Sequence, residues 1–140
     1  MNGRWTPVIA LWSRRPAHDT MEWMSTILIV DDDPRFRLQA SNLLGSDGFE
    51  VVGEATDGAS GLEAARSLQP DFVLLDIGLP DVEGFEIADA LANDGQAPMV
   101  VLTSSRDARA YGRRLASSSI LGFIPKERIS GAAIRALVDQ

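Results

Sequence analysis

The sequence contains no cysteine and only one histidine, His18. Without cysteine the chain has no disulfide bonds, no thiolate nucleophile and no cysteine-bound metal. A single histidine cannot build a histidine-rich zinc site. The net charge of -7 argues against direct binding to nucleic acid, because the phosphate backbone selects basic surfaces. These absences leave an ordinary acidic protein or one that gathers cations.

Long apolar runs are also missing. The longest near the N-terminus, Pro7 to Trp12, is far shorter than the roughly 20 residues that span a bilayer. No small-residue cleavage pattern follows it, so a signal peptide is not expected either. We therefore expect a cytoplasmic protein without contact with a membrane. A length of 140 residues suits one domain with a single core.

Residues 1–24 differ from the rest of the chain. They hold all three tryptophans, the histidine and three of the four methionines, and they show no sustained helical or strand period. One interpretation is a disordered N-terminal extension, with the working start at Met21 or Met24. The other is a tryptophan-bearing docking peptide. The sequence does not decide between them, and we take 1–24 as an extension and 25–140 as the domain.

Beyond residue 24, short apolar runs alternate with helical patterns. The runs are rich in β-branched residues and indicate strands that are buried on both faces. The predicted strands cover residues 26–30, 49–55, 71–76, 98–103 and 120–124. Proline, glycine and aspartate mark the ends of the intervening helices. The predicted helices cover residues 34–44, 57–68, 82–92, 106–116 and 129–138.

Apolar residues within the first two helices predict which faces are buried. The expected inward residues are Phe36, Leu38, Leu43 and Leu44 in the first helix, and Leu62, Ala65 and Leu68 in the second. Buried strands that alternate with helices predict an α/β fold with a doubly wound parallel sheet and right-handed crossovers. Such sheets bind ligands beyond the carboxyl ends of their strands, at the switch point of strand order.

Chemically distinctive residues follow four of the predicted strands. They are Asp31, Asp32 and Asp33 after the first, Asp76 at the end of the third, Thr103 at the end of the fourth and Lys126 after the fifth. Neighbouring carboxylates raise each other's pKa unless a cation intervenes, and Mg²⁺ is a cation that accepts such ligands. A carboxylate beside Mg²⁺, a hydroxyl and a lysine is equipped for phosphoryl transfer as the nucleophile. No glycine-rich phosphate loop is present, which disfavours a nucleotide site.

Four segments within residues 26–138 resemble the receiver domain of two-component response regulators. They are Ile27–Pro34, Asp71–Pro80, Val100–Ser104 and Gly122–Lys126. The resemblance implies a chemotaxis-regulator-like domain with a flavodoxin-like (βα)5 fold and strand order 2-1-3-4-5. It also implies that Asp76 accepts a phosphoryl group from a sensor histidine kinase or a phosphotransfer protein. Because the chain ends at Gln140, directly after the last predicted helix, we expect a stand-alone receiver or a segment of a longer protein.

The resemblance also implies roles for the other site residues. Mg²⁺ would be held by Asp31, Asp32, Asp76 and the backbone carbonyl of Gly78. Thr103 matches the switch hydroxyl, Lys126 matches the lysine that pairs with the phosphoryl group, and Phe123 matches the aromatic switch position. Asp33 lies just outside the acidic pair, at a position that is often Glu.

Three features depart from the commonest pattern of that family. Glu127 follows Lys126 where many receivers have a proline in a cis peptide, so a cis Lys126–Glu127 bond is not assumed. Phe123 lacks the hydroxyl that a tyrosine would carry. Gly78 and Ser105 are small, which would leave water free to approach an acyl phosphate.

We expect phosphorylation to switch the surface made by the fourth helix, the fifth strand and the last helix. That surface would bind an unidentified downstream protein or a second copy of the chain. Five arginines in this part of the chain would form either solvated helix faces or a partner-binding patch: Arg109, Arg113, Arg114, Arg128 and Arg135.

The chain is not expected to be an enzyme beyond self-catalysed phosphoryl transfer and autodephosphorylation. Two other functions compete with that of a phosphorylated receiver. A phosphate-independent pseudo-receiver that acts as a binding module is the alternative. A hydrolase of the haloacid-dehalogenase type is disfavoured, because Pro34 and Arg35 follow the first acids where that family has a small or hydroxyl residue.

Overall fold

The structure, a computed structural model, describes residues 25–140. The predictions made for residues 1–24 lie outside these described residues. The strands are β1 (Thr26–Val30), β2 (Glu50–Ala55), β3 (Phe72–Asp76), β4 (Met99–Ser104) and β5 (Gly122–Pro125). The α-helices are α3 (Pro34–Ser46), α4 (Gly58–Leu68), α5 (Gly84–Ala92), α6 (Arg113–Ser117) and α7 (Gly131–Val138). Two short 3₁₀ helices are η1 (Ala108–Ala110) and η2 (Lys126–Arg128).

The five strands form one parallel sheet with the order β2-β1-β3-β4-β5. This confirms the predicted flavodoxin-like topology. In this order β2 lies on one side of β1, whereas β3, β4 and β5 follow one another on the other side, so the direction in which the chain adds strands reverses between β1 and β3. The carboxyl ends of β1 and β3 therefore border the crevice where such sheets place their ligands. Over residues 25–140, no helix is both long enough and apolar enough to cross a bilayer.

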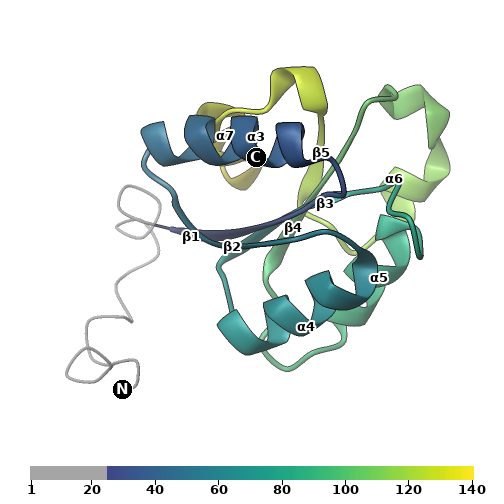
Figure 1. Cartoon of the computed structure of the whole chain (residues 1–140). Coiled ribbons are helices and arrows are strands. Elements are labelled where there is room, and N and C mark those ends of the chain that lie inside the picture. Colours follow the sequence, from purple (N-terminus) through teal and green to yellow (C-terminus); the bar gives the residue numbers. More distant parts are fainter. Residues whose placement is uncertain (1–24) are drawn as a thin grey trace.

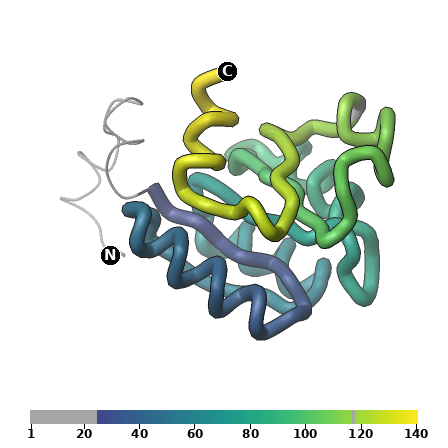
Figure 2. Tube along the Cα trace, turned by 90° about the horizontal axis from the view of Figure 1, so that it is seen from above, coloured from purple at the N-terminus to yellow at the C-terminus, as the bar shows by residue number. Residues whose placement is uncertain are grey.

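Helices cover both faces of the sheet (Figure 1). On one face, α3 and α7 bury a cluster that includes Phe36, Ala40 and Ile134. On the other face, α4 and α5 bury a cluster that includes Phe85 and Leu91. Figure 2 looks onto the first of these faces and shows α3 and α7 lying over the sheet. The central strands are buried from both sides, which explains why they read as continuous apolar runs.

The inward residues of α3 were predicted incorrectly in part. Phe36, Ala40 and Leu44 are buried, whereas Leu38 is 63% exposed and Leu43 is 40% exposed. A helix turns about 100° per residue, so positions spaced by four form one stripe and Leu38 lies on the opposite side. In α4, Ala65 is buried and Leu62 packs against the core as predicted.

Leu68 of α4 was also predicted to face inward, yet it is 46% exposed. It is the last residue of the helix and lies over Gly53 of the edge strand β2, where its Cδ1 would be 2.9 Å from an added Cβ. The sheet ends at this strand, so only one side of Leu68 is covered.

The helix predicted over residues 106–116 was wrong in extent. In this range the structure has only the single turn of η1 and the short helix α6, separated by Tyr111 and Gly112. Gly112 has φ +53°, a left-handed conformation that interrupts a right-handed helix. The segment between β4 and β5 therefore begins as an irregular loop, which later forms one wall of the site.

A close approach at Gly84 gives a test of how α5 is seated. A Cβ at this position would lie 2.5 Å from the backbone oxygen of Asp76, so Gly84→Ala must push α5 away from the end of β3. We expect it to lower the free energy of unfolding by about 1–3 kcal/mol in urea denaturation, the scale of overpacking. Gly45→Ala is the matched control, because nothing lies within 4 Å of its Cβ position in the last turn of α3. That change should stabilise by about 0.5–1 kcal/mol through helix propensity, and equal losses in both variants would contradict the packing argument.

Candidate functional site

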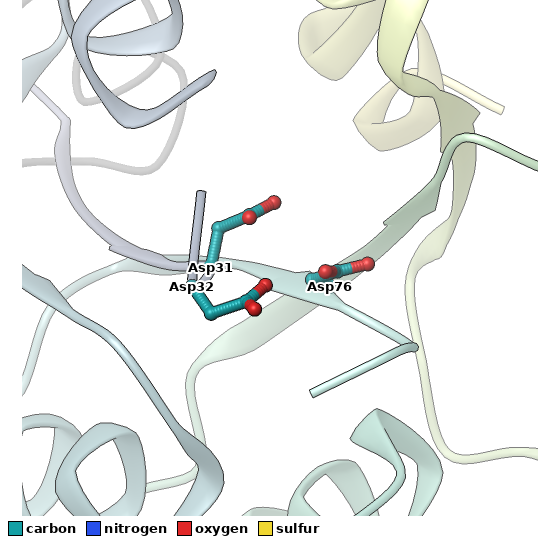
Figure 3. A group of neighbouring side chains, drawn as sticks. All are labelled: Asp31, Asp32 and Asp76. Carbon is teal, nitrogen blue, oxygen red and sulfur yellow. The ribbon is translucent and has the colours of Figure 1, made fainter. Parts of the chain in front are cut away.

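Three aspartates meet at the edge of the sheet where β1 and β3 end (Figure 3). One carboxylate oxygen from each of Asp31, Asp32 and Asp76 lies within 4.8 Å of the others. Asp31 is fully buried, Asp76 is 6% exposed and Asp32 is exposed. The sequence predicted all three as site residues, and the structure brings them together, with Asp32 on the solvent side.

Asp31 is held in place by its own backbone and by a neighbouring helix. Its N–H donates to the carbonyl of Ala55 at 3.0 Å, and its Oδ1 accepts the N–H of Asp33 at 2.9 Å. Its carbonyl accepts a hydrogen bond from Nη1 of Arg37 at 2.7 Å, and Arg37 is itself paired with Glu54 at 3.0 Å. The sequence analysis did not single out Arg37, which lies on the first turns of α3. The position of the Asp31 side chain is thus fixed from β2 and α3.

Lys126 lies between the two buried carboxylates. Its Nζ is 2.7 Å from Oδ2 of Asp31 and 3.6 Å from Oδ2 of Asp76. The ammonium also lies 4.7 Å from the centre of the Phe36 ring, which favours the charged form. No peptide bond between residues 25 and 140 is cis, so Lys126–Glu127 is trans. Lys126 reaches the acids as predicted.

The charges of this cluster alter its proton affinities. Burial, followed by the charge of Asp31, raises the pKa of Asp76, although Lys126 and the N–H of Gly78 pull it partly back. Burial alone would lower the pKa of Lys126, but its bond to Asp31 and the charges of both acids outweigh burial and raise it. The carboxyl groups of three aspartates therefore meet a single ammonium in this cluster. The residual negative charge favours a further cation.

The oxygen atoms of the site fit a hard divalent cation. Such ions select carboxylate and carbonyl oxygens, and these are the atoms that converge here. Oδ2 of Asp31 is buried without a hydrogen bond of good geometry, although the Lys126 ammonium is close to it. Asp32 supplies a carboxylate from the solvent side, and Gly78 lines the same cleft. The only charged partner of this buried oxygen in the described residues is the Lys126 ammonium, which a metal ion could replace or supplement.

The segment between Asp76 and α5 is fixed by hydrogen bonds at both ends. The N–H of Gly78 donates to Oδ1 of Asp76 at 3.2 Å, and Gly78 forms an antiparallel bridge with Glu83. Further along, the Asp81 carboxylate accepts the N–H groups of Gly58 and Ala59 at 2.7 and 3.0 Å, at the start of α4. These bonds lower the pKa of Asp81. They hold the Gly78 backbone next to the acidic cluster.

Thr103 lies beside Asp76 in the sheet, because the two residues are register partners in β4 and β3. Its side chain is fully buried, and its hydroxyl donates to the carbonyl of Ile124 at 2.6 Å. Phe123 is partly buried, and its ring lies 6.1 Å from that of Tyr111. Thr103 is therefore next to Asp76, with its hydroxyl bound to β5, and Phe123 packs against Tyr111 of the segment after β4.

A cleft of about 420 Å³ opens over Asp76. It is lined by Asp32, Asp33, Asp76, Ile77, Gly78, Leu79, Glu83, Ser104, Ser105, Arg106, Tyr111 and Lys126. Four of these lining residues were not predicted from the sequence: Glu83, Ser104, Arg106 and Tyr111. Two signals were present in the sequence: Ser104 directly follows Thr103, and Tyr111 is the only tyrosine of the chain.

The arginines of the expected partner patch do not share one surface. Arg114 pairs with Glu83 and lies 4.2 Å above the Phe85 ring, on the α5 side of the sheet. Arg135 donates to the backbone carbonyl of Asp47 and lies 4.9 Å from the Phe49 ring, on the α3 side. Of the two alternatives left open for the five arginines, a single shared patch does not include both Arg114 and Arg135, because each packs on an aromatic ring on a different face of the sheet.

The sequence of residues 27–138 matches the family described as response regulator receiver domain. The chain belongs to this family. It is similar to the transcriptional regulatory protein PdtaR of Mycobacterium tuberculosis, with 32% identity over 118 residues, which cover 78% of this chain and 58% of PdtaR. It is also 28% identical over 100 residues to the DNA-binding transcriptional activator EvgA of Escherichia coli, which cover 71% of this chain and 49% of EvgA. The chain thus spans about half the length of the curated relatives it matches.

Solved receiver structures share the same fold. The signal receiver domain of NarL from Mycobacterium tuberculosis superimposes with a TM-score of 0.75 at 30% identity, and covers 84% of this chain and 95% of that domain. A LuxR-family DNA-binding response regulator from Staphylococcus aureus has a TM-score of 0.73 at 19% identity, and covers 83% of this chain and 97% of that chain. The second likeness supports the fold alone. The chain is therefore a receiver domain of the two-component type.

The raised pKa of Asp76 predicts that its ionised carboxylate destabilises the fold in the absence of metal. Asp76→Asn should therefore raise Tm by a few degrees at pH 7, measured by thermal unfolding in EDTA. This destabilisation is fully present above the raised pKa that Asp76 has in the folded chain, and it disappears below the ordinary carboxyl pKa of 3.8. The gain in Tm should accordingly vanish as the pH falls below that value. Asp89→Asn, on the exposed face of α5, is the charge control, and an equal gain from it would refute a local origin.

Proposed function

We propose that this receiver accepts a phosphoryl group on Asp76 from a sensor histidine kinase or a phosphotransfer protein, with Mg²⁺ as its metal. The observation that carries the proposal is the position of the Asp76 carboxylate at an open cleft, beside Lys126 and two further acids. Burial and a neighbouring carboxylate both destabilise the ionised form of Asp76, and groups perturbed in this way cluster at functional sites. Membership of the receiver-domain family supports phosphoryl transfer to an aspartate as the class of reaction.

Four groups would hold the metal: the carboxylates of Asp31, Asp32 and Asp76 and the backbone carbonyl of Gly78. When bound, Mg²⁺ supplies positive charge that neutralises the oxygens of a transferring phosphoryl group. Asp31 is preorganised for this role by the bonds to its backbone from Ala55 and Arg37. Asp32 is exposed, so it can adjust as a ligand enters.

The chemistry of transfer belongs to Asp76. A carboxylate oxygen of Asp76 would attack the phosphorus of a phosphohistidine, so that a P–O bond forms as the P–N bond breaks. The electron pair of the P–N bond would return to the imidazole nitrogen, which takes up a proton from solvent. The product is a mixed carboxylic–phosphoric anhydride. Lys126, 3.6 Å from Asp76, is close enough to pair with a phosphoryl oxygen and offset the added charge of about -1.5 to -2. Return to the free state requires water to attack the phosphorus and release inorganic phosphate.

A new phosphoryl group would compete for the Thr103 hydroxyl. That hydroxyl is now donated to Ile124, so reaching the phosphoryl oxygens requires it to leave β5. Phe123 precedes Ile124 and packs at the adjoining edge of the core, so its ring is free to follow. Phosphorylation would thereby alter the surface formed by α6, β5 and α7. This two-state response is the proposed output.

The output partner is part of the proposal. The relatives PdtaR and EvgA are named as regulators of transcription, and the matched segment is about half of each. We propose that the altered surface binds a protein, either a downstream partner or a second copy of the receiver. The cytoplasm is the proposed location, because phosphotransfer from a kinase draws on the nucleotide pool there. The chain would act on no separate substrate, and its only catalysis would be on its own Asp76.

Intact mass spectrometry tests the central step. With Mg²⁺ and acetyl phosphate, the native chain should gain one phosphoryl group, and the gain should be absent in EDTA and in Asp76→Asn. Lys126→Ala should still fold but accumulate the product at least tenfold more slowly, since one charge-assisted contact to the phosphoryl group is lost. Glu127→Ala, at the exposed neighbour of Lys126, is the matched control. If neither acetyl phosphate nor a phosphohistidine donor adds mass, the chain is a phosphate-independent binding module.

A further inference from the structure

Tyr111 is packed into the wall of the cleft. Its ring lies 5.9 Å from the ring of Phe85 and 6.1 Å from the ring of Phe123, with both contacts tilted or edge-on. It ends the short helix η1, in the segment that joins β4 to α6. The same residue lines the cleft that contains Asp76 and Lys126. Tyr111 therefore contacts the core, the acidic site and the aromatic residue of β5.

The hydroxyl of Tyr111 has one short hydrogen bond. It lies 2.6 Å from Oγ of Ser104, the residue that follows Thr103 at the end of β4. Ser104 is only 4% exposed, and its Oγ also accepts the N–H of Arg106 at 3.0 Å. The bond closes residues 104–111 into a loop over one side of the cleft. The bond joins two neutral hydroxyls, one of which belongs to a nearly buried serine, so its loss would cost on the order of 1 kcal/mol.

We propose that Tyr111 is a positioning residue for phosphoryl transfer: its hydrogen bond to Ser104 is a latch that holds the end of β4 in the unphosphorylated arrangement. This inference rests on the proposed function and deepens it. Tyr111 does not touch the reacting atoms. It acts through Ser104 on the adjacent Thr103, and through its ring on Phe123.

The physical basis is the continuity of the backbone between Thr103 and Ser104. To reach a phosphoryl group on Asp76, the Thr103 hydroxyl must leave the Ile124 carbonyl, and Ser104 moves with the same stretch of chain. The bond from Ser104 to Tyr111 opposes that movement. Once it opens, the Tyr111 ring loses its anchor while still packed on Phe123. Because Phe123 has no hydroxyl of its own, Tyr111 supplies the one aromatic hydroxyl of the cleft wall.

Removing the latch should make the phosphorylated arrangement easier to reach. Tyr111→Phe keeps the ring and deletes only the hydroxyl, and we expect acetyl phosphate to phosphorylate this variant about fivefold faster, the factor that one neutral hydrogen bond represents. Ser104→Ala should give the same increase, and the double variant should add nothing to either single change. Ser104→Thr retains a hydroxyl and should restore the native rate. Ser119→Ala, in the exposed loop before β5, is the matched serine control.

A spectroscopic signature separates a latch from general loosening. Tyr111 is the only tyrosine, so growth on 3-fluorotyrosine places one ¹⁹F label in the full chain, next to this hydroxyl. The native chain and the Ser104→Ala variant should differ in ¹⁹F chemical shift before phosphorylation. With Mg²⁺ and acetyl phosphate, the native resonance should move toward the position of the variant, and the resonance of the variant should move much less.

The outcomes distinguish the latch from the function on which it rests. Intact mass, taken on the same samples, reports whether Asp76 carries phosphate. A phosphorylated native chain whose ¹⁹F resonance stays in place overturns the latch and leaves the proposed function standing. Additive rate effects of Tyr111→Phe and Ser104→Ala also overturn it. A chain that gains no mass overturns the proposed function, and the latch falls with it.

Discussion

The site depends on one electrostatic constraint: two buried carboxylates, Asp31 and Asp76, share the ammonium of Lys126. Taking carboxylates out of water is expensive, and their attraction to one lysine repays only part of the cost. The remaining imbalance appears as the raised pKa of Asp76. The site is therefore stable enough to fold and yet favours any ligand that brings positive charge or relieves the crowding. We regard this imbalance as the physical basis of the proposed metal binding and the proposed phosphoryl transfer.

The fold serves mainly to create and maintain this constraint. Parallel pairing of β1 with β3 places Asp31 and Asp76 at the same edge of the sheet, and β5 ends where Lys126 can reach them. Bonds from neighbouring elements then remove the freedom that would let the acids separate. Arg37 fixes the backbone of Asp31 from α3, and Asp81 ties the segment after Asp76 to α4. A functional site with such fixed geometry loses little entropy when it binds its ligand.

The parallel sheet and the acidic residues at its edge could be predicted from local sequence patterns, whereas the strand order was implied only by the resemblance to receiver domains. Each central strand is a short apolar run, and Asp31, Asp76 and Thr103 stand where such runs end. The extent of the helix after β4 could not be predicted, because the left-handed conformation of Gly112 leaves no trace in the apolar period. The prediction of the buried residues of α3 was wrong for Leu38, because it considered that Leu38 is apolar but not its angular position around the helix. Tyr111, Ser104 and Arg37 were missed because their roles arise from tertiary contacts.

Calorimetric titration of Mg²⁺ into the metal-free chain shows whether the imbalance of charge draws a cation to the acidic cluster. We expect one ion to bind, and we expect Asp32→Asn to weaken its binding at least tenfold, since one carboxylate ligand is removed from an exposed position that the fold does not need. Asp89→Asn should bind Mg²⁺ as the native chain does. A native chain that does not bind Mg²⁺, or whose affinity is unchanged by Asp32→Asn, would contradict the account.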